Sequence, residues 1–551
     1  MKPVIAFTAF AALASAQFIP NQPVVFHPAV ESKAEHAGSI EGPPLGKTPP
    51  APAIPARSGA GRGGRAGGPP AIPPAPPAPD IPAAGAAVEQ VAQGERPAIQ
   101  PSASFDGLGA GLSGGGRGGI DISLAAGPDH IFEILNGNFA VFTKKGKKYD
   151  TTGKLLYGPA PNNTLFTGFG VRCGVSNNAD SVVRYDQTAQ RWLIVVPVFT
   201  HPPDNPQGPY AMCYAVSKTP DPLGPYYRYE FQRPLFPDYP RPAIWPDGYY
   251  TPTSTSDDPL PGVVTQKHDC IADRNRMLKG LPAAEQCVVI DGAVFMLNAD
   301  MDGTRPPPPG APNIMMSTGG TQLLKNFEDD GIYFYKVHVD WTDPGRTTIS
   351  PPQKIPVAPY HYLCDGQLSS CVSQPGTERR LDSQGDKLIE RLIYRNFNDH
   401  ETILAEHSVA TSEHRGGVRW YEFRLNKQRD PVLFQQSTYA PDGFYRWLGS
   451  MALDRKGNIG MGFSFGGDPN FPGQRFAARL ANDPKGRLTF HESVLAEGQA
   501  SQTSTLRWED YTNIAVDPSD GCTFWFVGNY LKSGATSSTT RIGAFKIPGC
   551  K

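Results

Sequence analysis

The sequence predicts an all-β fold, a β-propeller, from three observations. Short apolar runs separated by turn residues follow one another through residues 120–551. A phrase of one form recurs, with a charged residue, an apolar strand, a tight turn and a second strand, as in "ADSVVRYDQTAQRWLIVVPVF", "RWLGSMALDRKGNIGMGFS" and "RWEDYTNIAVDPSDGCTFWFVGNY". Helical periodicity is nearly absent, apart from one short helix expected in "HDCIADRNRMLKGL". Four short strands in about 40 to 60 residues is the period and content of a propeller blade.

The recurring phrase also predicts the number of blades. Seven unit starts are expected, which gives seven blades, with six left open: His130, Asp180, Asp238, Gln286, Asp382, Arg446 and Arg507. A pair of β-sandwiches is the alternative architecture, but it does not explain why the same opening recurs. In a propeller each blade buries its two faces only against its neighbours, so a repeated unit is expected.

Individual stretches support strands. "HIFEILNGNFAVFT" carries an Asn-Gly turn between two apolar runs, which predicts a hairpin, and "QCVVIDGAVFMLNADMDG" repeats the pattern with Asp-Gly. "GDKLIERLIYRNFNDHETILAEHSV" alternates apolar and polar residues with period two. It is therefore expected to form strands, although Leu388–Leu392 alone could be read as helical.

Composition divides the chain into three parts. Residues 1–16, "MKPVIAFTAFAALASA", have the basic start, short apolar run and small-residue cleavage site of a signal peptide, so secretion is expected. Residues 17–119 are rich in Pro, Ala and Gly and are expected to form a disordered spacer. Residues 120–551 are expected to form the propeller domain. No other apolar run approaches the roughly 18 residues of a transmembrane helix.

The eight cysteines predict disulfides, because they are even in number and form no C-x-x-C pair. Neighbours in sequence are the simplest partners. The expected pairs are Cys173–Cys213, Cys270–Cys287, Cys364–Cys371 and Cys522–Cys550. The formal net charge of −1 provides no basic field for nucleic acid, so none is expected as a partner. The protein is expected to be a monomer.

Several longer stretches resemble an uncharacterised family of secreted, mostly bacterial, β-propeller-like proteins. They include "GPDHIFEILNGNFAVFTKKG", "FPDYPRPAIWPDGYYT", "LIYRNFNDHETILAEHSV" and "QQSTYAPDGFYRWLGSMALDRKGNIGMGFS", and the resemblance runs from about Phe105 to the C-terminus. Where many members have Gly in the last motif, this chain has Glu509. The resemblance implies the fold but brings no catalytic residues. "AVSKTPDPLGPYYRYEF" and "WPDGYY" are also locally similar to propeller glycosidases of arabinan and xylan side chains.

Charged residues at the start of the repeated phrase are the candidate site. The innermost strands of a propeller begin at one face of the central channel, so polar residues there converge from different blades. Asp180, Asp238 and Asp510 are the candidate catalytic residues, with Asp129, Asp382 and Glu401 as further acidic candidates. Converging carboxylates need a cation or arginines, so Ca²⁺ is a candidate cofactor. For any single Asp, a turn-forming role is the simpler reading.

Other residues are candidates for ligand binding. Aromatic side chains in loops could stack on sugar rings, and basic side chains could pair with the acidic groups. The predicted ligand-binding residues are His130, Tyr249, Tyr250, His400, Tyr445, Arg446 and Arg507. The tryptophans of the strand motifs are expected to pack between blades instead. A zinc site is weakly supported, because His400 and Glu401 point to opposite faces of a strand.

Together these features predict a secreted propeller that recognises extracellular or cell-wall polysaccharide. Two alternatives stay open: a glycoside hydrolase or lyase whose carboxylates lie at the channel mouth, and a non-catalytic structural surface protein. No nucleophile elbow, phosphate loop or dinucleotide fingerprint is present in the sequence. If the protein is an enzyme, a carbohydrate-active hydrolase is the class expected.

Overall fold

A computed structural model describes residues 24–34, 40–52, 80–109 and 121–551, except 171, 202–204, 206–207, 234, 254–265, 293–294, 320–329 and 367–369. The predicted signal peptide, residues 1–16, lies outside the described residues. Strands dominate. The helices among the described residues are short: α1 (Ala83–Ala86), α2 (Arg274–Met277) and the 3₁₀ turns Leu45–Lys47, Asn162–Phe166, Pro344–Arg346 and Leu363–Asp365. None of them has the length and apolarity that a membrane span requires.

The strands of the first half form antiparallel groups of four in chain order. The first group is β5 (Ser123–Ala126), β6 (His130–Leu135), β7 (Asn138–Thr143) and β8 (Leu155–Pro161). The second is β9 (Val182–Asp186), β10 (Arg191–Val198), β11 (Tyr210–Ser217) and β12 (Tyr226–Arg233). The third is β13 (Ala243–Trp245), β14 (Gly248–Thr253), β15 (Gln266–Ala272) and β16 (Ala284–Asp291).

The second half continues this pattern, except that two of its groups are joined into one sheet. The fourth group is β17 (Met296–Asp302), β18 (Asn313–Thr318) and β19 (Gly331–His338), edged by β20 (Thr348–Ile349) and β21 (Gln353–Pro356). The fifth is β24 (Leu392–Asn396), β25 (Glu401–Ala410), β26 (Gly416–Leu425) and β27 (Pro431–Tyr439). β17 and β24 pair in parallel, so these two groups share one sheet.

The last groups complete the order. The sixth is β28 (Tyr445–Leu453), β29 (Ile459–Gly467), β30 (Asn470–Arg479) and β31 (Ser493–Ala496). The seventh is β32 (Asn513–Val516), β33 (Thr523–Tyr530), β34 (Thr539–Lys546) and β4 (Ala103–Gly109). A separate hairpin, β22 (Ser370–Gln374) and β23 (Thr377–Asp382), lies between the fourth and fifth groups in sequence.

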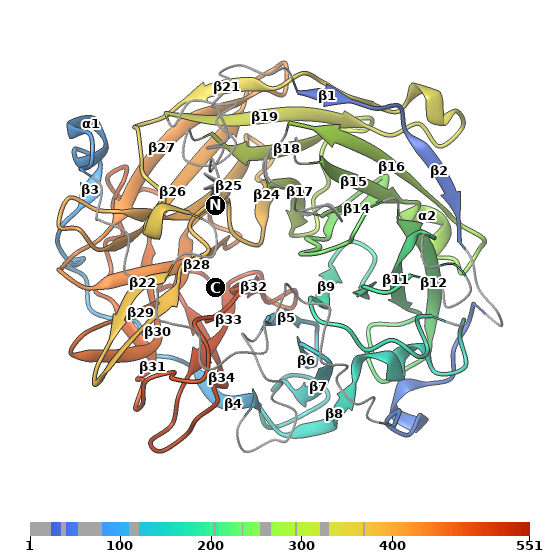
Figure 1. The fold of residues 1–551 in the computed structure, drawn as a ribbon, viewed down its shortest axis with the longest axis horizontal. Helices are drawn as coiled ribbons and strands as arrows, with labels where there is room; N and C mark the ends of the chain where they lie inside the picture. The colour runs from blue at the N-terminus through green and yellow to red at the C-terminus, as the bar shows by residue number, and fades with distance from the viewer. Residues whose placement is uncertain are drawn as a thin grey trace, which may run out of the picture.

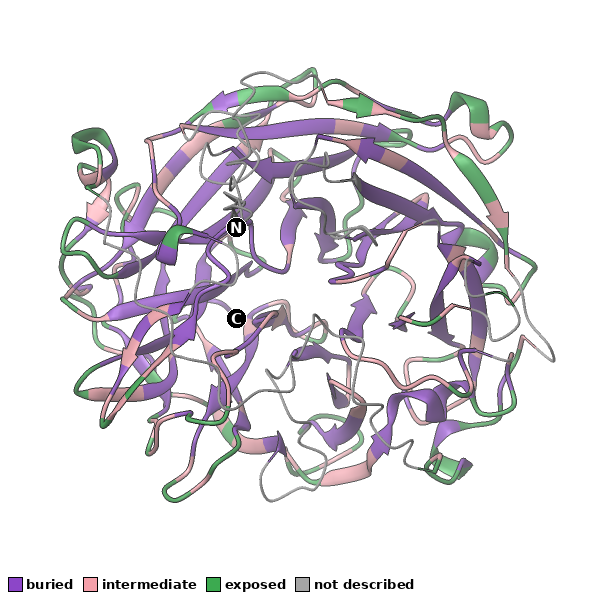
Figure 2. Ribbon diagram, in the orientation of Figure 1, coloured by how far each residue is buried: buried purple, intermediate pink, exposed green. Residues whose placement is uncertain are grey.

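The groups are arranged around a common centre, as Figure 1 shows, with the first strand of each group inward and the last strand at the rim. The parallel pairing of β17 with β24 shows that these two inner strands run in the same direction. Figure 2 shows that the strands are largely buried and that the exposed residues lie mostly in the outer connections. The arrangement explains why the sequence repeats: each group buries its faces against the next.

The core consists of apolar layers between neighbouring groups. Phe132 of the first group packs on Trp192 of the second, with ring centroids 5.8 Å apart, and Trp192 is fully buried. The other tryptophans expected to pack between units are also buried: Trp420, Trp447, Trp508 and Trp525. A buried aromatic ring brings a large apolar area out of water, so these residues stabilise the contacts between groups.

The N-terminal part departs from the predicted spacer of residues 17–119. β4 pairs with β34, β1 (Val25–Phe26) and β2 (Val30–Lys33) pair with β16, and β3 (Glu89–Gln90) pairs with β27. These segments cover sheet edges that would otherwise leave backbone N–H and C=O groups unpaired. The predicted boundary at residue 119 is therefore wrong, because the seventh group takes its fourth strand from residues before it.

Other local predictions divide. The Asn-Gly hairpin exists as β6 and β7, Leu392–Asn396 and Glu401–Ala410 are strands, and the short helix is α2, capped by Asp273. The Asp-Gly hairpin is wrong: β16 pairs with β15 and β17 with β18, so this turn joins two groups. The unit starts expected near His130, Gln286 and Asp382 are also wrong, since these residues lie in β6, β16 and β23.

All four predicted disulfides are confirmed: Cys173–Cys213, Cys270–Cys287, Cys364–Cys371 and Cys522–Cys550. Each closes a short stretch of chain, with sequence separations from 7 to 40 residues. Cys270 and Cys287 lie opposite each other on β15 and β16, and the last pair ties the chain end to the turn before β33.

Candidate functional site

Carboxyl groups gather where the inner strands begin. Asp180 lies two residues before β9, Asp510 three residues before β32, and Asp238 five residues before β13. Asp121, two residues before β5, joins them. These four inner strands belong to four successive groups around the centre, since the seventh group is followed by the first. The structure therefore brings together the three residues predicted as catalytic.

The side chains of this acidic cluster contact one another directly. Asp180 is hydrogen-bonded to the carboxyl groups of both Asp121 and Asp238. The Oδ2 atom of Asp180 also accepts the backbone N–H of Tyr239 at 3.0 Å. Asp180 and Tyr239 both have left-handed backbones, with φ of 61° and 54°. Non-glycine residues in this region carry a conformational cost, which the contacts around Asp180 and Tyr239 must offset.

Arg507 neutralises the other side of the cluster. Its guanidinium donates to Asp382 Oδ2 at 2.5 Å and to Asp510 Oδ1. Asp382 Oδ1 also accepts the backbone N–H of Trp508 at 3.0 Å, and Gln384 Nε2 donates to Asp510 Oδ1 at 2.8 Å. The neighbouring carboxylates raise the pKa of Arg507 above its usual range, so it stays charged. Predicted Arg507 therefore lies in the same site as predicted Asp510.

Three carboxyl groups of the site hold a proton more tightly than an ordinary aspartate does. Burial, with the charge of Asp510, raises the pKa of Asp121 to about 7. Burial and the Asp121 carboxyl raise the pKa of Asp180 well above its usual value. The pKa of Asp382 is raised to about 6 by burial, although Arg507 opposes the shift. Carboxyls this close cannot all ionise, so the buried pair holds a proton near neutral pH.

Exposure divides the cluster into a front and a back. Asp121 and Asp180 are buried, with 4% and 5% of their surface exposed. Asp510 has 17% of its side chain exposed and Arg507 31%, and Asp238 is half-buried. A ligand approaching this end of the ring would meet Asp238, Asp510 and Arg507 first, with the proton-holding pair behind them.

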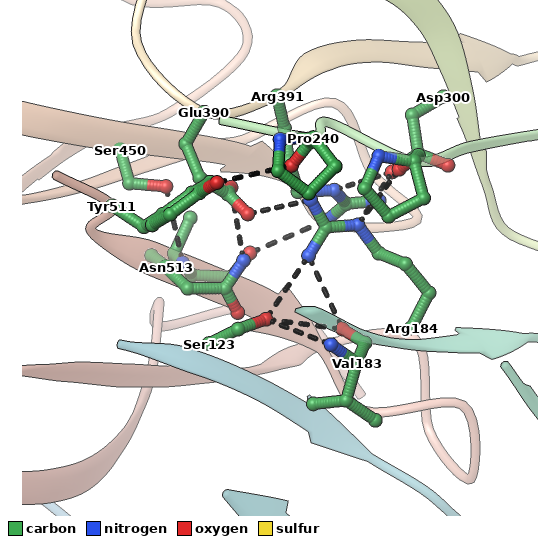
Figure 3. A network of polar contacts seen from close by, with 12 residues as sticks. Ser123, Val183, Arg184, Pro240, Asp300, Glu390, Arg391, Ser450, Tyr511 and Asn513 are labelled. Atoms are coloured by element: carbon green, nitrogen blue, oxygen red, sulfur yellow. Dashed lines mark hydrogen bonds and ion pairs between the residues drawn. The ribbon is translucent and has the colours of Figure 1, made fainter. Parts of the chain in front are cut away.

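Further along the inner strands, buried charged and polar side chains form a network of contacts (Figure 3). Arg184 of β9 donates to Glu390 Oε1 at 2.6 Å, and Asn513 of β32 donates to Glu390 Oε2 at 2.9 Å. Arg391 pairs with Asp300 and Asp302 of β17 at 2.6 and 2.9 Å. Buried ion pairs of this kind tie the inner strands together and leave the acidic cluster at one mouth.

The remaining predicted ligand-binding residues lie elsewhere, and the structure contradicts them as members of this site. Tyr249 and Tyr250 are fully buried in β14, where their hydroxyls donate to Asp186 and Asp247. His130 begins β6, at the opposite end of the first group, 3.7 Å from Asp221, and burial lowers its pKa to about 4. Tyr249 and Tyr250 were expected in loops because turn-forming residues lie next to them in the sequence, and His130 was expected to begin a unit, but each lies in a strand that buries it.

The other three are also away from the cluster. Tyr445 and Arg446 lie in β28 and are buried, and Arg446 pairs with Asp442 and Glu492 at 2.7 and 2.8 Å. His400 lies in the turn after β24, beside Asp399 and stacked on Phe397. Glu401 pairs with Arg429. Arg446 was predicted from the Arg-Trp pair it shares with Arg507, but the two arginines differ in position: Arg446 lies within its strand and Arg507 six residues before one.

Asp121 and Gln384 were missed. Asp121 precedes the apolar stretch "ISLAA" as the other acids precede theirs, so the same signal was present. Its place beside the Gly-rich segment concealed it. Gln384 gave no signal, because it reaches the cluster from the loop after β23.

The donor set does not fit the predicted Ca²⁺ ion. Ca²⁺ takes six to eight oxygen ligands. Here Arg507 and Gln384 engage the oxygens of Asp382 and Asp510, and Asp121 and Asp180 are hydrogen-bonded to each other. An arginine and a shared proton therefore balance the negative charge that a cation would otherwise balance.

No family model matches the chain, so the secreted family named above stays a prediction. No curated protein matches it either. Among solved structures it is similar to a subtype N10 neuraminidase-like protein of A/little yellow-shouldered bat/Guatemala/060/2010, with 7% identity, TM-score 0.32, and 66% of this chain and 96% of that one covered. It is also similar to an endo-arabinase from Bacteroides thetaiotaomicron (10% identity, TM-score 0.26, 68% and 95% covered). A third is the α-L-arabinofuranosidase PaAbf62A from Podospora anserina (10%, 0.27, 82% and 97%). Likenesses at this level do not extend to activity.

Proposed function

We propose that the protein is a secreted seven-bladed β-propeller that binds an extracellular polysaccharide at the mouth formed by Asp238, Asp510 and Arg507. One observation carries the proposal: carboxyls from four successive inner strands converge at one end of the ring, with Asp510 and Arg507 partly exposed. Carboxylates accept hydrogen bonds from sugar hydroxyls, and a guanidinium donates to their oxygens. The seven groups of strands and the four disulfides support the fold and an oxidising compartment.

The test compares Asp510→Asn with Asp399→Asn in binding to a panel of immobilised plant and microbial polysaccharides. Asp399 is 79% exposed and lies after β24, away from the cluster, which makes it a matched control. Asp510→Asn is expected to weaken binding about tenfold, since a hydrogen bond to a charged group contributes about 1.5–3 kcal/mol. Asp399→Asn should bind as the unaltered protein does. Equal binding by both variants would show that Asp510 takes no part in binding, and the proposed site would be wrong.

A glycoside hydrolase is the second candidate, and the proton held by the Asp121–Asp180 pair favours it. General acid catalysis of glycoside hydrolysis needs a carboxyl that still holds a proton near neutral pH. The Asp121–Asp180 pair holds a proton near neutral pH, and Asp510 lies within its electrostatic reach. Release of reducing ends from a bound polysaccharide, lost in both Asp238→Asn and Asp510→Asn, would establish hydrolysis. Binding without release of reducing ends would support a binding protein. Absence of both binding and release would support a structural surface protein.

A further inference from the structure

A second charged group lies at the same mouth, beside the acidic cluster. Arg241 precedes β13, Lys267 lies in β15 and Lys387 precedes β24, and all three are buried. They converge on the ring of Phe295, just before β17: Lys387 Nζ lies 4.4 Å, Lys267 Nζ 4.8 Å and Arg241 Cζ 5.8 Å from its centroid. We refer to these three cations as the basic cluster.

Two of the three cations have partners. Lys387 Nζ donates to Asp386 Oδ1 and Gln384 Oε1, each at 2.6 Å. Arg241 donates to the carbonyl of Met296 at 2.9 and 3.1 Å. Among the described residues, the Lys267 side chain makes no hydrogen bond or ion pair. Its Nζ lies over the Phe295 ring, and 4% of the residue's surface is exposed.

The position of Lys267 is costly without a partner. Burial, together with the charge of Arg241, lowers its pKa to about 7. A nearly buried ammonium beside two other cations is destabilised by desolvation and by repulsion, and an anion would relieve both. Lys267 Nζ is not among the fully enclosed side-chain atoms that lack a partner in the described residues, so the nitrogen keeps some contact with solvent.

Asp238 connects the two clusters. It hydrogen-bonds to Asp180 in the acidic cluster, and its charge acts on Lys267 and Arg241 in the basic one. This end of the ring is thus polarised. Acceptors for hydroxyl groups lie on one side, and on the other lies Lys267, whose ammonium has no hydrogen-bond acceptor among the described residues. A neutral sugar would satisfy only the acidic side.

We propose that the ligand is an anionic polysaccharide, and that Lys267 binds the carboxylate of a uronic acid or the sulfate of a sulfated sugar. This inference rests on the proposed function, because the same ligand places its hydroxyls against Asp238 and Asp510. A planar carboxylate or a sulfate would supply Lys267 Nζ with oxygen acceptors that none of the described residues gives it. Arg241 adds positive potential beside Lys267 and favours an anion over a neutral group, whereas the charge of Lys387 is balanced by Asp386.

The experiment uses the full chain and pairs of polysaccharides that differ only in charge. Polygalacturonate and alginate are compared with their carboxyl-reduced forms, and dextran sulfate with dextran, by calorimetry or by retardation in affinity electrophoresis. Tighter binding of the uronates than of their reduced forms assigns a carboxylate, and selective binding of dextran sulfate assigns a sulfate. Three variants accompany the unaltered protein: Lys267→Met, Lys267→Arg and Lys456→Met, the last removing an exposed lysine in the turn between β28 and β29.

Lys267→Met is expected to weaken binding of the charged polymer about tenfold or more and to leave the neutral polymer unaffected. Lys267→Arg should keep the preference for charge, and Lys456→Met should match the unaltered protein. Equal affinity for charged and neutral forms overturns the charge assignment and leaves the proposed function standing. Binding of neither form overturns both. If Lys267→Met does not fold, the charge preference of the unaltered protein and of Lys267→Arg still decides the question.

Discussion

Asp121 and Asp180 are hydrogen-bonded to each other through their carboxyl groups, although they precede the inner strands of two neighbouring groups. Two buried carboxyls in such contact hold a proton between them, because ionising both would place like charges together out of water. The contact also couples the geometry of β5 to that of β9. The site therefore forms only when the first and second groups pack together, and the shared proton is bound only in the folded protein.

This pair should make stability depend on pH in a defined direction. The pKa of Asp121 is raised from 3.8 to about 7 in the folded protein, so the folded state binds a proton that the unfolded state has lost. The contribution is fully present below about pH 4 and is lost as the pH rises through about 7, at up to about 1.4 kcal/mol per pH unit. Asp121→Asn, which cannot ionise, should lack this slope.

Urea unfolding at intervals from pH 4 to pH 8 measures the difference. The free energy of unfolding of Asp121→Asn, relative to the unaltered protein, should rise between pH 4 and pH 7 and then level off. Asp80→Asn, at an exposed position before α1, is the control and should show a constant difference. A flat difference for Asp121→Asn as well would mean that Asp121 ionises normally in the folded protein.

Arg507 should be required for the stability of the site. Arg507→Met leaves Asp382 buried and Asp510 beside it without their cation. Removing one partner of a buried pair costs about 3–5 kcal/mol, and the 31% exposure of the Arg507 side chain reduces this to about 2 kcal/mol. The loss should grow as the pH rises above about 6, the pKa of Asp382 with Arg507 in place. In the unaltered protein Asp382 then ionises beside Arg507, whereas without Arg507 its pKa is higher and the ion pair is not gained.

A double-variant cycle isolates this interaction. Arg507→Met with Asp382→Asn should recover most of the stability that Arg507→Met loses, because the buried charge is then gone. Thermal unfolding at pH 5 and pH 8 gives both comparisons. Additive losses in the double variant would show that the two residues act independently.

The sequence predicted more of the site than of its surroundings. Asp180, Asp238, Asp510 and Arg507 were found because a charged residue before an apolar strand is a local pattern, and ring closure turns that pattern into convergence. Tyr249, Tyr250 and Tyr445 were misread as loop residues, because turn letters lie next to them while β14 and β28 bury them. Whether a residue is buried depends on strands that are distant in sequence, and a local sequence pattern gives no information about them.

The position of Lys267 could not be predicted from the sequence for a similar reason. Lys267 carries no motif. Its neighbours Phe295 and Lys387 come from other groups of strands, and Arg241 comes from before the first strand of its own group. The disulfides were predictable because each joins cysteines that are adjacent among the eight along the chain. Pairing between neighbours in sequence did not predict β4, because β4 pairs with β34, more than 400 residues later in the chain.

That closure yields the last prediction, on the segment first expected to be a spacer. β4 lies along β34, Leu108 is fully buried, and Phe105 packs on Phe142 of the first group with ring centroids 5.3 Å apart. Tyr530 and Arg541 both donate to Asp106 at 2.8 Å. β4 therefore contacts both the last group and the first, and should hold the two ends of the ring together. Leu108→Ala in the full chain is expected to cost about 2–5 kcal/mol, the range for emptying a buried leucine site.

Shortened chains test the same point without a point substitution. A chain beginning at residue 80 keeps β3 and β4, whereas one beginning at residue 121 lacks both. The first is expected to melt close to the full chain, and the second well below it, because β34 then exposes an unpaired edge and the apolar layer over Phe142 opens. Adding a peptide of residues 98–112 to the second chain should restore part of the lost melting temperature if pairing with β34 is the cause. Equal melting of the two chains would mean that the ring closes without β4, and that the stretch through residue 119 is a spacer after all.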